Sequence, residues 1–153
     1  MPQNNSTDIE AEHSPCVFCK IAAGDAAASI VYETTQLFAF LDNHPLFPGH
    51  VLLCPREHCT TLLDIPRGLS GPLMETTRLL AEAVESALDA EGTFIAINNR
   101  VSQTVPHLHV HIVPRRPRDG LRGFFWPRQH YKDEAAREAV RYAIERQMQK
   151  LMV

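Results

Sequence analysis

The sequence predicts an α+β domain in which helices pack on an antiparallel sheet. Short runs rich in Val, Ile, Tyr and Phe are separated by turn signals, and one longer segment repeats its apolar residues at helical spacing. The chain has 153 residues, of which 44% are apolar and 22% are charged. That size and composition are those of one globular domain, so a disordered or fibrous chain is excluded.

Five runs are expected to form strands, at residues 29–33, 37–41, 50–54, 93–98 and 107–113. The polar residues 34–36 between the first two runs are typical of a hairpin. Pro48-Gly49 marks a turn before the third run, after a loop over residues 42–49. Short turns of this kind favour antiparallel pairing of neighbouring strands.

Two segments are expected to be helical. The clearer one covers residues 70–90, with Ser70 as its N-cap and Gly92 as its stop signal. Its apolar residues recur every three or four positions on one face: Leu73, Thr77, Leu80, Val84 and Leu88. The second helical pattern covers residues 133–152, with Val140, Ile144, Met148 and Leu151 as its apolar positions.

The ends of the chain differ from its centre. Residues 1–15 are polar and are expected to form a disordered tail, with structure starting near Cys16. The main domain is expected to span residues 16–117, and residues 118–153 form a C-terminal extension with a helix. Residues 120–128 of the extension are an aromatic and basic insertion, in which Trp126 could stack on a base or pack in a dimer contact.

Charge and hydropathy exclude several functional classes. The formal charge of −3 argues against a globally basic nucleic-acid binder. No apolar run approaches the ~20 residues of a membrane span, and no signal peptide opens the chain. Four cysteines are too few for a disulfide scaffold of this size, so they are expected to be reduced thiols or metal ligands in a cytoplasmic protein.

Three histidines, His107, His109 and His111, alternate with apolar residues. Alternate side chains of a strand point to one face, so the three imidazoles are expected to share a face while the residues between them enter the core. Imidazole can act as nucleophile, proton carrier or metal ligand. The plain alternative is a solvated strand face.

Polar residues flank the histidines on both sides. Upstream lie the neutral donors Asn98, Asn99, Ser102, Gln103 and Thr104, and downstream the basic run Arg115, Arg116, Arg118, Arg122 and Arg128. Donors and cations around a nucleophilic histidine fit a phosphate ester or anhydride. A polar turn and a solvated charged face are the alternatives.

Cys16 and Cys19 form a Cys-x-x-Cys motif. By itself the motif fits a zinc half-site, a redox pair or coincidence. A closed structural zinc site needs two more ligands, and the candidates are Cys54, Cys59, His58 and His107. Cys54 lies in an apolar run and is expected to be a small buried hydrophobe.

Residues 103–113 read Gln-Thr-Val-Pro-His-Leu-His-Val-His-Ile-Val, and this stretch resembles the signature of the histidine triad (HIT) superfamily. Residues 38–42 and 48–58 resemble the N-terminal half of the same family, so the resemblance covers roughly residues 16–117. It implies a homodimer with a five-stranded antiparallel sheet in each subunit, and an enzyme that hydrolyses or transfers nucleotides.

The resemblance also implies individual roles. His109 would attack the α-phosphorus and form a nucleotidyl-histidine intermediate, and His111 would contact phosphate and help protonate the leaving group. His50 would be buried beside the triad and support it, and Asp42 would bind ribose. The phosphate loop would comprise Asn98, Gln103 and Thr104, with Asn99 as the alternative to Asn98 because the loop is shorter than in the best-known members.

Some branches of the family, and the related galactose-1-phosphate uridylyltransferases, hold a structural zinc. The matching ligands here would be Cys16, Cys19, His58 and His107. In this interpretation the metal pins the N-terminal segment near the triad and takes no part in the chemistry.

The leading hypothesis is a nucleotide hydrolase or nucleotidyl transferase acting at an α-phosphate. Its substrate would be a dinucleoside polyphosphate or a nucleoside phosphoramidate, and the Gln103-Thr104 pair before the triad and the arginines after it slightly favour the former. One alternative is a non-catalytic nucleotide-binding, zinc-stabilised partner module. Another is a metal-dependent hydrolase with His107 and His109 as ligands, but the sequence offers no nearby carboxylate to complete that site.

Overall fold

A computed structural model of the chain describes residues 16–121 and 129–152. The expected tail at residues 1–15 and most of the 120–128 insertion, including Trp126, lie outside the described residues. The chain divides into two compact units, one ending at Asp119 and one beginning at Gly120. Each unit is described by itself.

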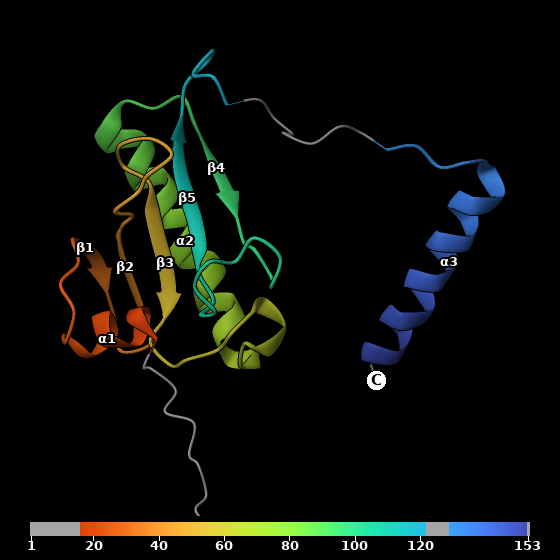
Figure 1. Ribbon diagram of the computed structural model, residues 1–153, viewed down its shortest axis with the longest axis horizontal. Coiled ribbons are helices and arrows are strands. Elements are labelled where there is room, and N and C mark those ends of the chain that lie inside the picture. Colours follow the sequence, from red (N-terminus) through yellow and green to blue (C-terminus); the bar gives the residue numbers. More distant parts are fainter. Residues whose placement is uncertain (1–15, 122–128, 153) are drawn as a thin grey trace, which may run out of the picture. The chain divides into compact units, whose positions relative to one another are not determined.

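The first unit is built on a five-stranded sheet, which confirms the predicted α+β class (Figure 1). Its strands are β1 (Ile30–Glu33), β2 (Leu37–Leu41), β3 (Val51–Pro55), β4 (Gly92–Ala96) and β5 (Val110–Arg115). They lie in the order β1-β2-β3-β5-β4, and every neighbouring pair is antiparallel. The β1–β2 hairpin forms as predicted, because the Thr34 hydroxyl accepts hydrogen bonds from the backbone of Gln36 and Leu37.

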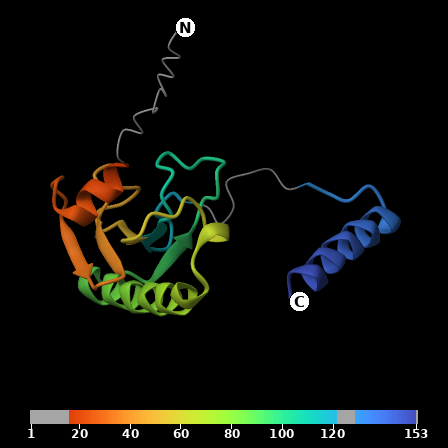
Figure 2. The same cartoon turned by 90° about the horizontal axis from the view of Figure 1, so that it is seen from below.

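Each face of the sheet carries one helix (Figure 2). Helix α2 (Arg67–Leu88) packs on one face, and its predicted apolar residues are buried there except Leu88. Helix α1 (Val17–Ala23) packs on the other face through Phe18, which contacts Phe40. The alternation of β5 sends Val110 and Ile112 toward α2, so the histidines face the α1 side.

Several element boundaries differ from those predicted. Helix α2 begins at Arg67, so Ser70 lies inside the helix and is not its N-cap. Its last residue is followed by Asp89 in the left-handed conformation, and Gly92 opens β4 instead of stopping the helix. Helix α1 and the short 3-10 turn η1 (Leu62–Asp64) were not predicted, since both are too short to show a periodic pattern.

Strand β5 begins three residues later than predicted. The backbone N–H of Leu108 donates to the carbonyl of Cys59, beyond the end of β3, over 2.7 Å. The backbone N–H of His107 donates to Val105 in a tight turn. These bonds divert His107–His109 from the sheet ladder, so that only His111 of the triad lies within a strand.

The second unit contains helix α3 (Glu134–Leu151), close to the predicted 133–152. The Asp133 carboxylate caps it by accepting a hydrogen bond from the N–H of Ala136 over 2.7 Å. Its apolar residues Ile144 and Met148 are exposed. Within the described part of the chain, none of the helices combines the length and apolarity that a bilayer span requires.

Candidate functional site

The three histidines of the triad gather on the α1 side of the sheet. The ring centroids of His107 and His109 lie 5.8 and 5.3 Å from that of Phe18, and those of His109 and His111 are 4.8 Å apart. The imidazoles therefore share one face, as their alternation predicts. Phe18 closes this face from α1, and both rings meet it edge-on.

A backbone carbonyl determines which ring nitrogen of His109 carries a hydrogen. Its Nδ1 lies 2.7 Å from the carbonyl oxygen of His107, which can only accept, so Nδ1 carries the hydrogen. The other ring nitrogen, Nε2, then holds a lone pair. The side chain is only 5% exposed, so the ring is held in place by its surroundings. A fixed neutral imidazole with a free Nε2 has the form of a nucleophile or general base.

His50 and His111 form a second, directly bonded pair. The backbone N–H of Leu46 donates to Nδ1 of His50 over 3.2 Å, so the proton of a neutral His50 sits on Nε2. That Nε2–H donates to Nδ1 of His111 over 2.9 Å. His111 must then carry its own proton on Nε2. The chain of bonds from Leu46 thus sets the tautomers of both rings.

Both rings of this pair are neutral at pH 7. The pKa of His111 is lowered to about 4, mainly by burial and also by the neighbouring His109 and His50. Burial also lowers the pKa of His50, against the opposing attraction of Asp42. A neutral His111 with a proton on Nε2 can donate a hydrogen bond to an oxygen or nitrogen of a ligand.

Asp42 follows β2 and reaches the same pair of rings. One carboxylate oxygen lies 3.6 Å from Nδ1 of His50, and the other accepts a hydrogen bond from the N–H of His44 over 2.8 Å. The side chain of Asp42 is 21% exposed, so a ligand can reach it. Asp42, His50 and His111 each bring one polar atom within 4.8 Å of the others.

The polar loop before the triad is braced by its own side chains. The amide of Gln103 donates to the carbonyl of Thr60 over 2.6 Å, and its oxygen accepts from the N–H of Arg100 over 2.8 Å. Asn99 accepts a hydrogen bond from the N–H of Leu62 over 3.0 Å. The side chains of Gln103 and Asn99, which were predicted to contact phosphate, therefore stabilise the conformation of the loop.

Asn98 and Thr104 complete the predicted set. The side chain of Asn98 donates to the carbonyl of Ser102 over 3.3 Å, a long bond, while its residue is only partly exposed. Thr104 is exposed. Of the two asparagines, Asn99 is committed to the segment after β3, so Asn98 is the better placed for a ligand contact.

The predicted zinc ligands converge beside the triad. Nδ1 of His107 lies 3.4 Å from the sulfur of Cys16 and 3.5 Å from that of Cys19. Nδ1 of His58 lies 3.3 Å from the sulfur of Cys19. A tetrahedral zinc with Zn–S near ~2.3 Å and Zn–N near ~2.0 Å separates sulfur and nitrogen ligands by about 3.6 Å. The four side chains therefore fit a closed tetrahedral site.

The surroundings of this cluster also suit a metal. Nε2–H of His107 donates to the carbonyl of Pro55 over 2.8 Å, which turns Nδ1 toward the sulfurs. Burial lowers the pKa of His107, so the ring is the neutral form that binds metals. Burial and the adjacent Cys16 raise the pKa of the Cys19 thiol, and a cation would reverse this effect. Cys54 is fully buried and lies outside the cluster, as predicted.

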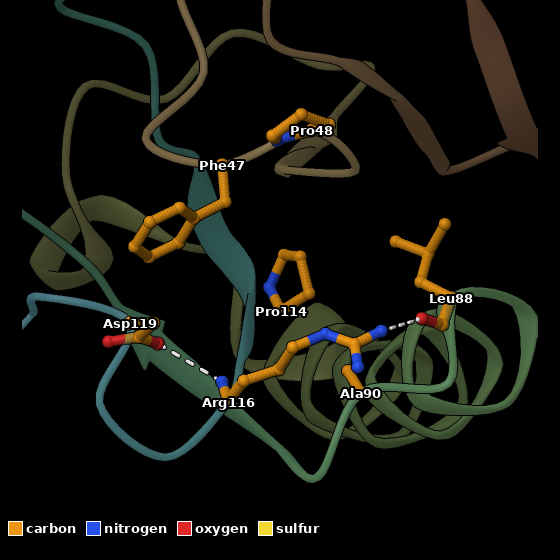
Figure 3. A pocket seen from close by; sticks show the side chains of 7 residues that line it. All are labelled: Phe47, Pro48, Leu88, Ala90, Pro114, Arg116 and Asp119. Carbon is orange, nitrogen blue, oxygen red and sulfur yellow. Dashed lines mark hydrogen bonds between the residues drawn. The ribbon is translucent and has the colours of Figure 1, made fainter.

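Arg115 and Arg116, which follow the triad, both have partners within the protein. Arg115 pairs with Asp119 over 2.6 Å, and the guanidinium of Arg116 donates to the carbonyl of Leu88 at the end of α2. Arg116 and Phe47 help to line a cavity of about 320 Å³. Figure 3 shows these side chains and the bond from Arg116 to Leu88 at the end of α2. Both guanidiniums are therefore engaged, and recruitment of an anion to the triad by these arginines stays a prediction.

Sequence reasoning missed two contributors to the site. Phe18 packs on two triad rings, and its only signal was an apolar position between the two cysteines. The backbone groups of Leu46 and Pro55, which orient His50 and His107, leave no signal in the sequence at all.

Comparison with known proteins supports this arrangement. A family model described as the HIT domain matches residues 23–118. An uncharacterised HIT-like protein of Mycobacterium tuberculosis is 38% identical over 109 residues, which cover 70% of this chain and 76% of the relative. The adenosine 5′-monophosphoramidase of Candida albicans is 30% identical over 123 residues, covering 76% of this chain and 81% of that enzyme.

A solved structure resembles the fold as well. The crystal structure of a zinc-bound histidine triad family protein from Mycobacterium smegmatis superposes with a TM-score of 0.67 at 34% identity. The match covers 89% of this chain and 97% of that one.

Proposed function

The chain belongs to the HIT family, and we propose that it is a nucleotide hydrolase that acts at an α-phosphate through a nucleotidyl-histidine intermediate. The observation that carries the proposal is the bond from Nδ1–H of His109 to the carbonyl of His107, which leaves Nε2 as a lone pair. Relatives in the family support nucleotide hydrolysis as the general activity, and the monophosphoramidase of C. albicans is one of them.

The proposed reaction has two steps. Nε2 of His109 attacks the α-phosphorus, and the new N–P bond forms as the bond from phosphorus to the leaving group breaks. The leaving group takes the Nε2 proton of His111. Water then attacks the same phosphorus, the N–P bond breaks, and the proton released by water returns to the His50–His111 pair.

Binding of the anionic substrate favours uptake of the proton that the first step uses. An anionic phosphate favours the protonated form of a nearby imidazole. The added proton occupies Nδ1 of His50 once that atom gives up the hydrogen bond from the N–H of Leu46, and the protonated Nδ1 then faces the carboxylate of Asp42, 3.6 Å away. When His111 gives up its Nε2 proton, the Nε2 proton of His50 transfers to Nδ1 of His111 along the existing bond, whose two nitrogens are 2.9 Å apart. The pair then ends neutral.

The remaining candidate residues would hold the nucleotide. Asp42 would accept hydrogen bonds from the ribose hydroxyls, and its partial exposure supports this role. Asn98 and Thr104 would contact phosphate. Gln103 has one amide hydrogen left for phosphate beyond its bond to Thr60.

The position of the arginines bears on substrate class. Since Arg115 is ion-paired with Asp119 and Arg116 is bonded to the carbonyl of Leu88, both guanidiniums are already engaged and offer less positive charge to a polyphosphate. A nucleoside phosphoramidate, with one phosphate to hold, fits the site better than a dinucleoside polyphosphate. The activity named for the C. albicans relative supports the same choice.

We assign a structural zinc to Cys16, Cys19, His58 and His107. Four protein ligands fill a tetrahedral site and leave no position for water or substrate, which is typical of structural zinc. When bound, the metal would neutralise two thiolates and join α1 to the triad segment. A metal-dependent hydrolase is disfavoured because His107 belongs to this closed set while His109 does not.

We also propose that the protein is a cytoplasmic homodimer with no membrane or nucleic-acid polymer as partner. Strand β4 lies at the edge of the sheet and exposes 45% of Ile95. An edge strand with an exposed apolar side chain suits pairing with a second copy. The four cysteines are free thiols, which suits a reducing compartment.

A covalent trapping experiment tests the function. The protein is mixed with an adenosine phosphoramidate or a diadenosine polyphosphate, quenched in milliseconds and analysed by peptide mass spectrometry. We expect an adenylyl group on His109 and faster turnover of the phosphoramidate. His109→Ala should abolish turnover while nucleotide affinity stays within about tenfold. His44→Ala removes an exposed histidine of the neighbouring loop and is the matched control.

The same experiment separates the alternatives. Nucleotide binding without turnover or adduct would identify a non-catalytic binding module. Turnover by metal-free His109→Ala protein would exclude the covalent mechanism.

A further inference from the structure

Arg56 connects three backbone segments beside the candidate metal centre. Its Nη1 donates to the carbonyl of Ala22 over 2.7 Å, and its Nε donates to the carbonyl of Thr34 over 2.6 Å. Its Nη2 pairs with the carboxylate of Glu33 over 2.6 Å. The guanidinium also lies 5.8 Å from the ring centroid of Phe38, and its side chain is 28% exposed.

The bond to Ala22 fixes the end of helix α1. Carbonyls in the last turn of a helix have no partner within the helix, and a cation there is favourable. Gly24 and Asp25 donate to the carbonyls of Ile21 and Lys20, and Arg56 takes that of Ala22. A seven-residue helix is not stable alone, so α1 depends on such contacts for its position.

The metal ligands come from segments that Arg56 touches. Helix α1 carries Cys19 and begins just after Cys16. Arg56 itself follows Pro55, whose carbonyl orients His107, and precedes the ligand His58 by two residues. The guanidinium therefore links α1, which carries Cys19 and follows Cys16, to the end of β3. There the carbonyl of Pro55 orients His107, and His58 follows in the chain.

We propose that Arg56 is a positioning residue that holds α1 against the end of β3 so that the two thiolates and two imidazoles meet at zinc distance. The inference rests on the proposed zinc site. Phe18 anchors the beginning of α1 on the triad face, and Arg56 anchors its end. With both ends fixed, the sulfurs are preorganised before the metal arrives.

The two carbonyl bonds carry this role, and the ion pair does not. Glu33 is 63% exposed, so its attraction to Arg56 is screened by solvent. The carbonyls of Ala22 and Thr34 belong to the backbone segments whose positions matter. Lysine has a single ammonium head and cannot reach both carbonyls in the geometry of the guanidinium fork.

Zinc affinity measured by competition with a chromophoric chelator tests the proposal. Arg56→Met should weaken zinc binding by about tenfold or more, the usual effect of removing a group that orients metal ligands. Arg56→Lys should be intermediate, and Glu33→Gln should stay within about twofold of wild type. Arg78→Met removes an exposed arginine that is ion-paired on α2, and it serves as the matched control.

A second readout separates positioning from general stability. The melting temperature is measured with and without zinc for each variant. If Arg56 positions the ligands, the rise caused by zinc should shrink in Arg56→Met, whereas a purely structural role would lower both temperatures equally. The thiolate-to-metal absorption of the cobalt-substituted protein should also weaken in this variant.

The outcomes are distinct. A folded Arg56→Met protein with wild-type zinc affinity overturns the role of Arg56 and leaves the zinc site intact. If Arg56→Met does not fold, Arg56→Lys with unchanged affinity overturns it in the same way. Wild-type protein that binds no zinc overturns both the metal site and this inference.

Discussion

Acid should destabilise the protein through His111. Burial lowers the pKa of His111 from its ordinary value of 6.5 to about 4 in the folded state. The unfolded chain therefore binds this proton more readily between these two pH values. Folding stability from the neutral ring is fully present above pH 6.5 and is lost as the pH falls toward 4.

The size of the effect follows from the same two values. One unit of pKa is worth about 1.4 kcal/mol, so the difference between 6.5 and about 4 amounts to about 3 kcal/mol of unfolding free energy. Near pH 5 almost one proton separates the unfolded from the folded state at this site. The free energy of unfolding should then change by about 1 kcal/mol per pH unit because of His111.

Urea denaturation followed by circular dichroism at several pH values from 7 to 4.5 measures this slope. Burial also lowers the pKa of His50 and His107, so the wild-type slope contains their contributions. The difference between wild type and His111→Asn measures the contribution of His111 together with its coupling to His50. His44→Asn, which removes an exposed histidine, is the control. Equal slopes for wild type and His111→Asn would refute the reasoning.

Four further predictions concern single substitutions. Gly49→Ala should lower the free energy of unfolding by about 2 kcal/mol, because Gly49 has a φ of +95° and a Cβ there would clash with the side chain of Leu88. Gly68→Ala, in open space on α2, should instead raise it by about 0.5–1 kcal/mol, and urea denaturation checks both. Ser102→Gly should stabilise the protein by about 0.5–1 kcal/mol, since Ser102 has a φ of 60°, and thermal unfolding would show no gain if this strain were absent. Asp42→Ala should raise KM more than it lowers kcat, because a ribose contact is made in ground and transition states alike, and equal processing of a dideoxy substrate would contradict it.

Periodicity predicted the parts of the fold that are long or regular. Leu73, Leu80 and Val84 repeat over a helix of 22 residues, and all three are buried against the sheet. The alternation around the triad placed the histidines and the core residues on opposite faces correctly. These patterns work because one buried face imposes the period on the sequence.

The remaining features depend on contacts between distant parts of the chain. Helix α1 forms where Phe18 meets the sheet and Arg56 caps its end, and seven residues carry no period that would reveal it. The tautomers of His50 and His109 are set by carbonyl and amide groups that any residue could supply. The partners of the arginines were hidden for the same reason, since nothing local shows that Arg116 bonds to the carbonyl at the end of α2.

His107 belongs to both centres, and this predicts how metal removal acts. Its ring bridges the two cysteine sulfurs, while its backbone carbonyl holds the proton of His109 over 2.7 Å. The carbonyl is also constrained by the Leu108 bond to Cys59, which needs no metal. Chelation should therefore lower the melting temperature strongly, because metal binding is coupled to folding, and should change kcat per folded molecule only slightly. Turnover and unfolding are measured on the same chelated sample, with re-added zinc as the control. A kcat that collapses at a temperature where the chelated protein is still folded would show instead that the metal orients the nucleophile directly.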